Sequence, residues 1–588
     1  MAHAAIVSIK TKAHAHQPRK HQTPVKAAPA KTAPPQADLK AASALPAAVW
    51  QYQVDLWQRS ILFLDILRER ANNMLAQEQA GLPPLLDFDY ETLLDARRFE
   101  RPANYALLRI TGSTTHRLED CLDASKPPVI IIDPRAGHGP GIGGFKQDSE
   151  VGIALHEGHA VYFVMFFPEP CPGQTLADVL HALRRFVEEA GRRHEGTPPV
   201  LYGNCQAGWA VMLLAADCEG LVGPVVLNGS PLSYWAGASD ANPMRLAGGL
   251  TGGAWIAHYM ADLGNGRFDG AWLAQNFENL NPANTLWDKN YKVFANIDGE
   301  RERFLDFERW WTGFYFLSRE EINATVQNLF IGNKLERGEM RIDECCSVDL
   351  KRVRNPIVIF ASHGDNITPP HQALNWVPAV YPSTKALKAA GQRIVYLLNP
   401  HVGHLGIFVS ASVARLEHRA ILESLGDLEA LKPGLYEMKI SNPTNDPDCR
   451  KPQYSVVFEE RKVEDIRFDY PSAEFEKVRK VSEFNEQLYS TFVSPWVRAG
   501  ANPISAEWLK WTHPMRTSRY LFSEKLNPWM AAVAAMAPWV SAYRERVSAD
   551  NPLLVGERAL SKQISTGLDA YRKHRDEATE AVFKRLYA

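Results

Sequence analysis

Residues 203–208, Gly-Asn-Cys-Gln-Ala-Gly, constrain the fold of this chain more than any other stretch. The apolar run at 199–202 before them predicts a short buried strand, and the run at 209–216 after them predicts a buried helix. A cysteine flanked by small residues on a sharp strand-to-helix turn is the pattern of a nucleophile elbow, with sulfur in place of oxygen. The alternative is a buried structural cysteine, which is common for free thiols. The elbow reading makes Cys205 the candidate nucleophile, and the start of the following helix favours negative charge on its sulfur.

Strand-like and helix-like segments alternate around this turn. Apolar strand patterns occur at residues 129–133, 161–167, 199–202, 224–228, 356–361 and 394–398, and helical patterns at 149–158, 175–194, 209–216 and near 371–377. Strands that are apolar on both faces and alternate with helices predict a parallel sheet covered on both sides. Together with the elbow, this alternation predicts an α/β-hydrolase fold.

The remaining segments suggest additions to that core. The expected units are a disordered basic Ala/Pro-rich tail at 1–45, an N-terminal helical region at 46–125, core segments at 126–235 and 351–425, an insertion at 236–350, and a C-terminal hairpin and helical region at 426–588. The insertion is rich in tryptophan, so we expect a lid over the site, with an extra packing layer as the alternative. The tail could contact an anionic surface or be a solvated leader without a role.

A nucleophile elbow needs a base and an acid, and in this fold the order along the chain is nucleophile, acid, histidine. Asp365 follows the strand predicted at 356–361, and His404 follows the strand predicted at 394–398. Taken singly, Asp365 could be a turn residue and His404 a helix cap. The order and the strand positions together predict a Cys205–His404–Asp365 triad.

Two parts of the site stay open to more than one residue. His401 is the rival base, and we prefer His404 because of its position in the loop. The oxyanion hole should use the backbone N–H of Gln206 and a second N–H from the loop after the strand at 129–133. Arg135 is our choice for that second donor, with Ala136 as the alternative.

Composition excludes several other classes of function. The chain has 588 residues with 65 basic and 67 acidic side chains, a balance that argues against nucleic-acid binding. Its seven cysteines contain no C-x-x-C pair, so we expect reduced thiols, no zinc site and no metal. The apolar run at 529–542 is too short to span a membrane, and no secretory signal is evident. We therefore expect a cytoplasmic protein.

Residues 139–144 match the G-x-G-x-x-G pattern of dinucleotide-binding loops. That reading requires the first glycine at the end of a strand and a helix that begins within the motif. Residues 134–138 separate the motif from the strand, and the helix begins only near Ser149. We therefore expect no nucleotide cofactor.

Beyond the triad, the insertion carries the segments Leu-Gly-Asn-Gly-Arg-Phe at 263–268, Leu-Trp at 286–287 and Asn-Leu-Phe-Ile-Gly-Asn-Lys-Leu at 328–335, followed by Val-Asp-Leu at 348–350. With the triad, these resemble poly(3-hydroxyalkanoate) synthases over roughly residues 120–410. From about residue 45 onward the chain resembles a proteobacterial branch of synthase-like proteins, the 3-hydroxyalkanoate synthetases. It departs from the synthases at Ala207, at Asn366 and at 406–409, where it lacks the usual glycine, histidine and Asn-Pro-Pro ending.

The resemblance implies an acyltransferase that moves a 3-hydroxyacyl group from a CoA thioester to a growing polyester. Acyl-CoA would be its substrate, with no separate cofactor. A thioesterase or polyester hydrolase with the same triad is the first alternative. A non-catalytic scaffold on a granule or membrane surface is the second, with the tail and the Trp-rich C-terminal helices as contacts. Expected partners are therefore acyl-CoA or polyester, a granule or membrane surface, and a second copy of the chain in a homodimer.

Overall fold

The computed structural model describes residues 37–114, 122–238, 241–342, 348–441, 453–466, 468 and 472–588. The part of the predicted tail at residues 1–36 lies outside the described residues. Residues 37–45, which the composition assigns to that tail, instead belong to helix α1 (Ala37–Gln79).

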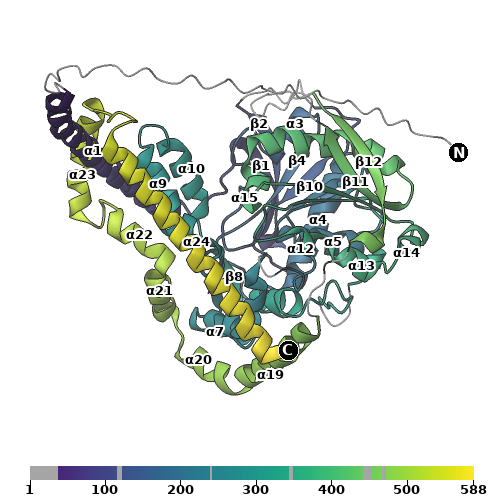
Figure 1. Ribbon diagram of the computed structural model, residues 1–588. Helices are drawn as coiled ribbons and strands as arrows, with labels where there is room; N and C mark the ends of the chain where they lie inside the picture. Colours follow the sequence, from purple (N-terminus) through teal and green to yellow (C-terminus); the bar gives the residue numbers. More distant parts are fainter. Residues whose placement is uncertain are drawn as a thin grey trace, which may run out of the picture.

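A ten-stranded sheet with the order β1-β2-β4-β3-β5-β6-β9-β10-β11-β12 forms the centre of the molecule (Figure 1). Its strands are β1 (Phe88–Asp95), β2 (Tyr105–Ser113), β3 (Val129–Ile132), β4 (Val161–Phe166), β5 (Val200–Asn204), β6 (Val225–Asn228), β9 (Ile357–Ser362), β10 (Arg393–Asn399), β11 (Gly434–Ser441) and β12 (Ser455–Arg461). The strands from β4 to β11 pair in parallel, whereas β1, β2 and β12 run antiparallel to their neighbours. The parallel strands therefore end at one common edge, where the predicted site residues follow them.

Helices cover both faces of this sheet, as the doubly apolar strands predict. One face packs against α4 (Leu176–Arg193), α5 (Ala207–Asp217), α13 (Trp376–Val380) and α14 (Thr384–Ala389). The other packs against α3 (Glu150–His156), α15 (His404–Val409), α16 (Ala411–Val413), α17 (Arg419–Glu423) and α18 (Leu425–Ala430). The short α12 (Pro370–Leu374) follows β9 and adds to the first layer. The molecule has an α/β-hydrolase fold with additional N- and C-terminal helical regions.

The N-terminal region is not wholly helical, which corrects the prediction for residues 46–125. After α1 the chain forms β1 and β2, and β2 pairs with β4 inside the sheet. Leu107 and Leu108 are both fully buried, one in the core on each face, so β2 is a core strand. Half of the residues of edge strand β1 are exposed, and the strand carries charged residues, a common property of edge strands that hides their pattern in the sequence.

The predicted hairpin exists but belongs to the sheet rather than to a separate C-terminal region. Strands β11 and β12 pair antiparallel, and β11 also pairs in parallel with β10. The core sheet therefore continues past residue 425, the boundary expected from the sequence. The segment between the two strands, 442–452, lies outside the described residues.

The insertion at 236–350 lies between β6 and β9 and is mainly helical. It contains α6 (Ala247–Leu250), α7 (Trp255–Leu263), α8 (Ala271–Leu280), α9 (Lys289–Ala295), α10 (Arg301–Trp311) and α11 (Arg319–Thr325). A small antiparallel sheet of β7 (Arg267–Asp269) and β8 (Phe316–Ser318), which the sequence did not indicate, ties its two halves together.

The C-terminal residues form helices α19 (Ser472–Leu488), α20 (Ser494–Gly500), α21 (Pro503–Thr512), α22 (Pro514–Phe522), α23 (Pro528–Ala542) and α24 (Pro552–Tyr587). With α1, helices α20–α24 make up a region that we call the arm, which lies to one side of the sheet in Figure 1. Ala537 and Val540 of α23 pack against Leu62 and Ile66 of α1. Within the described residues, none of the helices has a stretch long and apolar enough to cross a lipid bilayer.

Candidate active site

The structure brings together the three side chains of the predicted triad. The Sγ atom of Cys205 lies 3.1 Å from Nε2 of His404, and Nδ1 of His404 lies 2.7 Å from Oδ2 of Asp365. All three are buried, with 4 % of Cys205, 6 % of His404 and 3 % of Asp365 exposed. The contacts span the ends of β5, β9 and β10, so the common edge of the parallel strands assembles the site.

Cys205 sits on a strained turn between β5 and α5. Its φ angle is 48°, in the left-handed region that residues other than glycine rarely adopt. Its N–H donates to the carbonyl of Asn228 on β6, and its own carbonyl accepts from the N–H of Gly208. These bonds hold the sharp turn that directs a nucleophile out of the sheet, the geometry of the elbow.

The Asp365 carboxylate is fixed by its own loop. Its Oδ1 accepts hydrogen bonds from the N–H groups of Ile367 and Thr368, both at 2.8 Å, which leaves Oδ2 directed at His404. His404 is the first residue of α15, and its ring meets the ring of Phe408 edge to face. The imidazole is therefore held from both sides.

Electrostatics favour a positive charge on His404. Burial alone would lower its pKa, but the negative charges of Asp365 and Cys205, and the hydrogen bonds to both, raise the pKa of His404 to about 10. A protonated imidazole between two anions is the arrangement that stabilises a thiolate at neutral pH. The alternative base, His401, is exposed, and its backbone N–H donates to Oδ1 of Asn399.

Gln206 follows Cys205 and is the N-cap of α5. Because the first N–H groups of a helix have no partner within it, this region of backbone can receive an oxyanion. The side chain of Gln206 is held by Tyr234, whose hydroxyl donates to Oε1 of Gln206 at 3.0 Å. Burial and the charge of Cys205 raise the pKa of Tyr234 well above its ordinary value, which keeps this hydroxyl protonated.

Tyr234 is a site residue that the sequence analysis missed. It follows β6, so it lies at the same edge of the sheet as the other site residues, and this position was the available signal. Its backbone is fixed by Asn333 of the insertion and Gln372 of α12. Core and insertion thus both hold Tyr234 beside the elbow.

The loop after β3 contains Arg135, whose side chain reaches the insertion. Nε of Arg135 lies 2.6 Å from Oε1 of Glu321 in α11, and Nη2 donates to the carbonyl of Phe316. Both side chains of this ion pair are nearly fully buried. The predicted role of Arg135 concerns its backbone N–H and stays a prediction, as does the alternative at Ala136.

The glycine-rich loop at 139–144 binds part of the protein itself. The N–H groups of Gly141 and Gly143 donate to the carboxylate of Asp133 at the end of β3. Burial raises the pKa of Asp133 to about 6, although these hydrogen bonds act in the opposite direction. A phosphate would need the same N–H groups, so the loop serves to fold the chain over Asp133.

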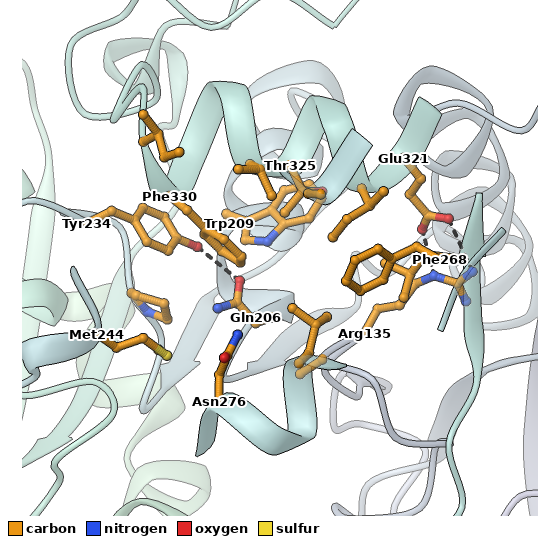
Figure 2. A pocket seen from close by; sticks show the side chains of 18 of the residues that line it. Arg135, Gln206, Trp209, Tyr234, Met244, Phe268, Asn276, Glu321, Thr325 and Phe330 are labelled. Atoms are coloured by element: carbon orange, nitrogen blue, oxygen red, sulfur yellow. Dashed lines mark hydrogen bonds and ion pairs between the residues drawn. The ribbon is translucent and has the colours of Figure 1, made fainter. Parts of the chain in front are cut away.

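A cavity of about 360 Å³ opens beside the elbow, between α5 and the insertion (Figure 2). Cys205 itself does not line it, whereas Gln206 and Ala207 do. Most of its wall is apolar; the lining includes Leu176, Trp209, Met244, Met260, Phe268, Trp272, Phe277, Leu317, Ile322 and Phe330. The indole N–H groups of Trp209 and Trp272 have no hydrogen-bond partner among the described residues. In the same part of the chain, no group of three or more His, Cys, Asp or Glu side chains is arranged to hold a metal.

Solved structures with a related fold include a carboxylesterase from Bacillus subtilis, CesB, at 10 % identity and a TM-score of 0.32, covering 61 % of this chain and 98 % of that one. A monoacylglycerol lipase from Paleococcus ferrophilus matches at 15 % identity and a TM-score of 0.30, over 52 % of this chain and 96 % of the other. The thioesterase domain of the curacin biosynthetic pathway matches at 11 % identity and 0.30, over 57 % and 99 %. At this distance the matches carry no information about substrate.

Sequence comparison gives a nearer relative. An uncharacterized protein encoded in the ackA 5′ region of Rhizobium meliloti is 44 % identical over 549 residues, which is 92 % of this chain and 74 % of the relative. The family model for a protein of unknown function, DUF3141, matches residues 55–588. The match takes in the core, the insertion and all but the first part of the arm, and this chain therefore belongs to the DUF3141 family.

Proposed function

We propose that this protein is an acyltransferase that carries its acyl group on Cys205, and that its donor is a 3-hydroxyacyl-CoA as in the synthases that it resembles. The observation behind the proposal is the 3.1 Å contact between Sγ of Cys205 and Nε2 of His404, completed by Asp365 at 2.7 Å. Nucleophile, base and orienting acid are the parts that covalent acyl transfer requires.

In the first half-reaction the proton of the Cys205 thiol passes to Nε2 of His404. The sulfur attacks the thioester carbonyl, the bond to CoA sulfur breaks, and the imidazolium returns its proton to that leaving sulfur. In the second half-reaction His404 takes the proton of an acceptor hydroxyl, whose oxygen attacks the acyl-Cys205 thioester. The Cys205 sulfur leaves, and an ester is released. Asp365 keeps the imidazole in the tautomer that both steps need.

Sulfur at the elbow suits transfer to a hydroxyl group. Exchange of one thioester for another keeps the acyl group activated, whereas a serine ester would lose that activation. Cys205 and His404 are both almost completely buried, so little water reaches the intermediate. This exclusion favours a hydroxyl acceptor over hydrolysis. The same triad with water as acceptor would make a thioesterase or polyester hydrolase.

The cavity beside Gln206 is the candidate site for the acyl chain. A cavity of about 360 Å³ lies within the size range of small-molecule pockets, so it has room for an alkyl chain. Its apolar wall suits an alkyl chain, and the side chain of Trp209 forms part of that wall (Figure 2). We therefore expect acyl groups of medium length to react faster than a four-carbon group.

The test is to incubate the protein with 3-hydroxybutyryl-CoA and with 3-hydroxyoctanoyl-CoA while free CoA, free acid and ester product are measured together. Mass spectrometry of the quenched protein should show the acyl adduct on Cys205. Cys205→Ala should abolish both adduct and CoA release. Cys171→Ala, a change at a half-buried free thiol outside the triad, should leave both unchanged.

Each outcome assigns the protein to one class. Ester or polymer together with a Cys205 adduct supports the acyltransferase. Free acid without ester would make it a hydrolase. Neither CoA release nor an adduct would leave the non-catalytic scaffold on a granule or membrane surface.

A further inference from the structure

Large apolar side chains stand exposed along the consecutive helices α20–α23. The most exposed are Trp529 at 82 %, Trp496 at 79 % and Ile504 at 73 %, with Trp508, Trp511 and Trp539 also exposed. Single exposed apolar residues are ordinary, but a series of this length marks an interaction surface. We call the solvent side of α20–α23 the outer face; Figure 1 shows these helices along the edge of the arm away from the sheet.

In α21 and α23 the helical spacing places these side chains on one side of the helix. Ile504, Trp508 and Trp511 follow one another at helical spacing in α21, whereas Ala506 of that helix is buried. In α23, Trp529, Met536 and Trp539 are exposed, and Met530, Val533, Ala537 and Val540 are buried against the arm. The exposed side chains of the outer face therefore lie on a different side of α21 and α23 from the buried side chains of these helices.

Helix α23 is unusual because it carries no charged residue at all over Pro528–Ala542. A surface helix normally presents charged and polar side chains to water. Here the half that packs inward and the half that faces outward are both apolar. An apolar helix face that is exposed in this way is suited to contact with another apolar surface.

The exposed basic side chains of the outer face are Arg498 and Lys525. Arg516 and Arg519 of α22 are buried in ion pairs with Asp269 and Glu78, and Lys510 pairs with Glu78 and Glu507. The acidic side chains between residues 494 and 543 are Glu507 and Glu524. Glu524 is paired with Arg68 of α1, and Glu507 with Lys510. Arg498 and Lys525 are exposed beside Trp496 and Trp529. Indoles next to basic groups form the pattern that seats a helix in an anionic lipid interface.

We propose that the outer face docks onto the surface of an anionic phospholipid membrane, with its indoles in the headgroup region and its basic side chains against lipid phosphates. A second copy of the chain suits this face less well. A twofold interface would set the same face against itself and bring Arg498 and Lys525 toward the same basic groups of the second copy, while Glu507 and Glu524 already have partners. The proposal does not depend on the proposed acyltransferase activity.

The test is co-flotation of the full chain with two kinds of vesicle, phosphatidylcholine alone and phosphatidylcholine mixed with phosphatidylglycerol. The wild type should bind the mixed vesicles more tightly, and added salt should weaken that binding. Trp496→Ala and Trp529→Ala should each lower the partition coefficient about tenfold, because each removes a large apolar side chain from the interface. Arg498→Glu with Lys525→Glu should abolish the preference for anionic vesicles.

Val457→Ala is the matched control, because Val457 is an exposed apolar residue on edge strand β12, outside the arm. It should bind as the wild type does. Residues 1–40 contain seven basic side chains, which can themselves attract anionic vesicles. The test therefore compares vesicle binding by the full-length wild type with vesicle binding by each full-length variant. Equal binding by wild type and tryptophan variants would overturn the proposal. So would a wild-type dimer in sedimentation that the tryptophan variants convert to monomer, since a second copy would then cover the face.

Discussion

His404 lies buried between two groups that carry negative charge, the carboxylate of Asp365 and the sulfur of Cys205. Folding therefore changes the proton affinity of this one imidazole strongly. The raised pKa of about 10 compares with an ordinary value of 6.5, so the folded protein holds the proton more tightly than the unfolded chain does. The interactions of His404 with Asp365 and Cys205 should therefore contribute to the free energy of unfolding of the protein.

The stability that His404 provides should depend on pH in a defined direction. Because its folded pKa is above its unfolded pKa, the contribution is fully present below pH 6.5 and is lost as pH rises toward 10. We expect the difference in unfolding free energy between wild type and His404→Gln to be on the order of 2–4 kcal/mol smaller at pH 10 than at pH 6. Urea unfolding at several pH values measures it. A difference that stays constant with pH would contradict the assignment of charge.

Asp365→Asn should preserve the shape of the site and remove the charge that orients His404. Without that charge the imidazole can adopt the wrong tautomer, so CoA release in a single turnover should slow by about 10³- to 10⁴-fold. The exposed turn residue Asp123, changed to Asn, provides the control and should leave the rate unaltered. Near-normal turnover in Asp365→Asn would remove Asp365 from the mechanism.

At the level of elements, the elbow depends on close contact between α5 and the segment after β6. A Cβ added at Gly208 would lie 2.2 Å from Cβ of Ser230 and 2.3 Å from its Oγ. Gly208→Ala should therefore displace the start of α5, destabilise the protein by about 1–3 kcal/mol and slow acylation of Cys205. Ser230→Gly in the same chain removes the clashing atoms and should restore part of both. Thermal unfolding and adduct formation measure the two effects, and full activity in Gly208→Ala alone would refute the argument.

Sequence patterns predicted the elements that surround the elbow because those patterns are local. The strands β3–β6, β9 and β10 are apolar on both faces, and each triad residue lies within five residues after the end of one of them. The edge strand β1 and its neighbour β2 were missed, since a charged edge strand has no clear pattern and β2 is recognisable mainly through its pairing. The hairpin β11–β12 was predicted, but its attachment to β10 is a tertiary contact that alternation does not encode.

The candidate site, like the fold, was predictable only where local sequence patterns define it. Cys205, Asp365 and His404 could be named because the chain order and the strand ends restrict them. Tyr234 could not, since its role depends on a hydrogen bond to Gln206 that only the folded chain creates. The wall of the cavity comes from helices far apart in sequence, such as α5 and α8, and no local motif links them.

At the scale of the whole molecule, a buried ion pair joins the arm to the insertion. Arg516 of α22 donates two hydrogen bonds to Asp269 of β7, at 2.9 and 2.7 Å. Burial raises the pKa of Asp269, but the charge of Arg516 outweighs it and keeps the pKa below its ordinary value. The N–H of Ala271 also donates to this carboxylate, but Arg516 makes the largest favourable contribution to its charge.

Arg516→Ala should leave Asp269 buried without a counter-charge and destabilise the protein by about 3–5 kcal/mol. Arg498→Ala, at an exposed site of helix α20 in the same arm, should change stability by less than about 0.5 kcal/mol. Denaturant unfolding gives both values. Equal effects of the two substitutions would mean that the pair does not connect the arm to the rest of the molecule.

The ion pair between Arg135 and Glu321 has a consequence for how substrate enters. One end of Arg135 belongs to the backbone that is expected to stabilise the reacting carbonyl, and the other end grips α11 of the insertion. Any outward swing of α11 that admits a long chain must pull on the same residue or break its buried pair. If the N–H of Arg135 is the second oxyanion donor, a movement of α11 would also displace that donor, and substrate entry and acyl transfer would then require two different conformations.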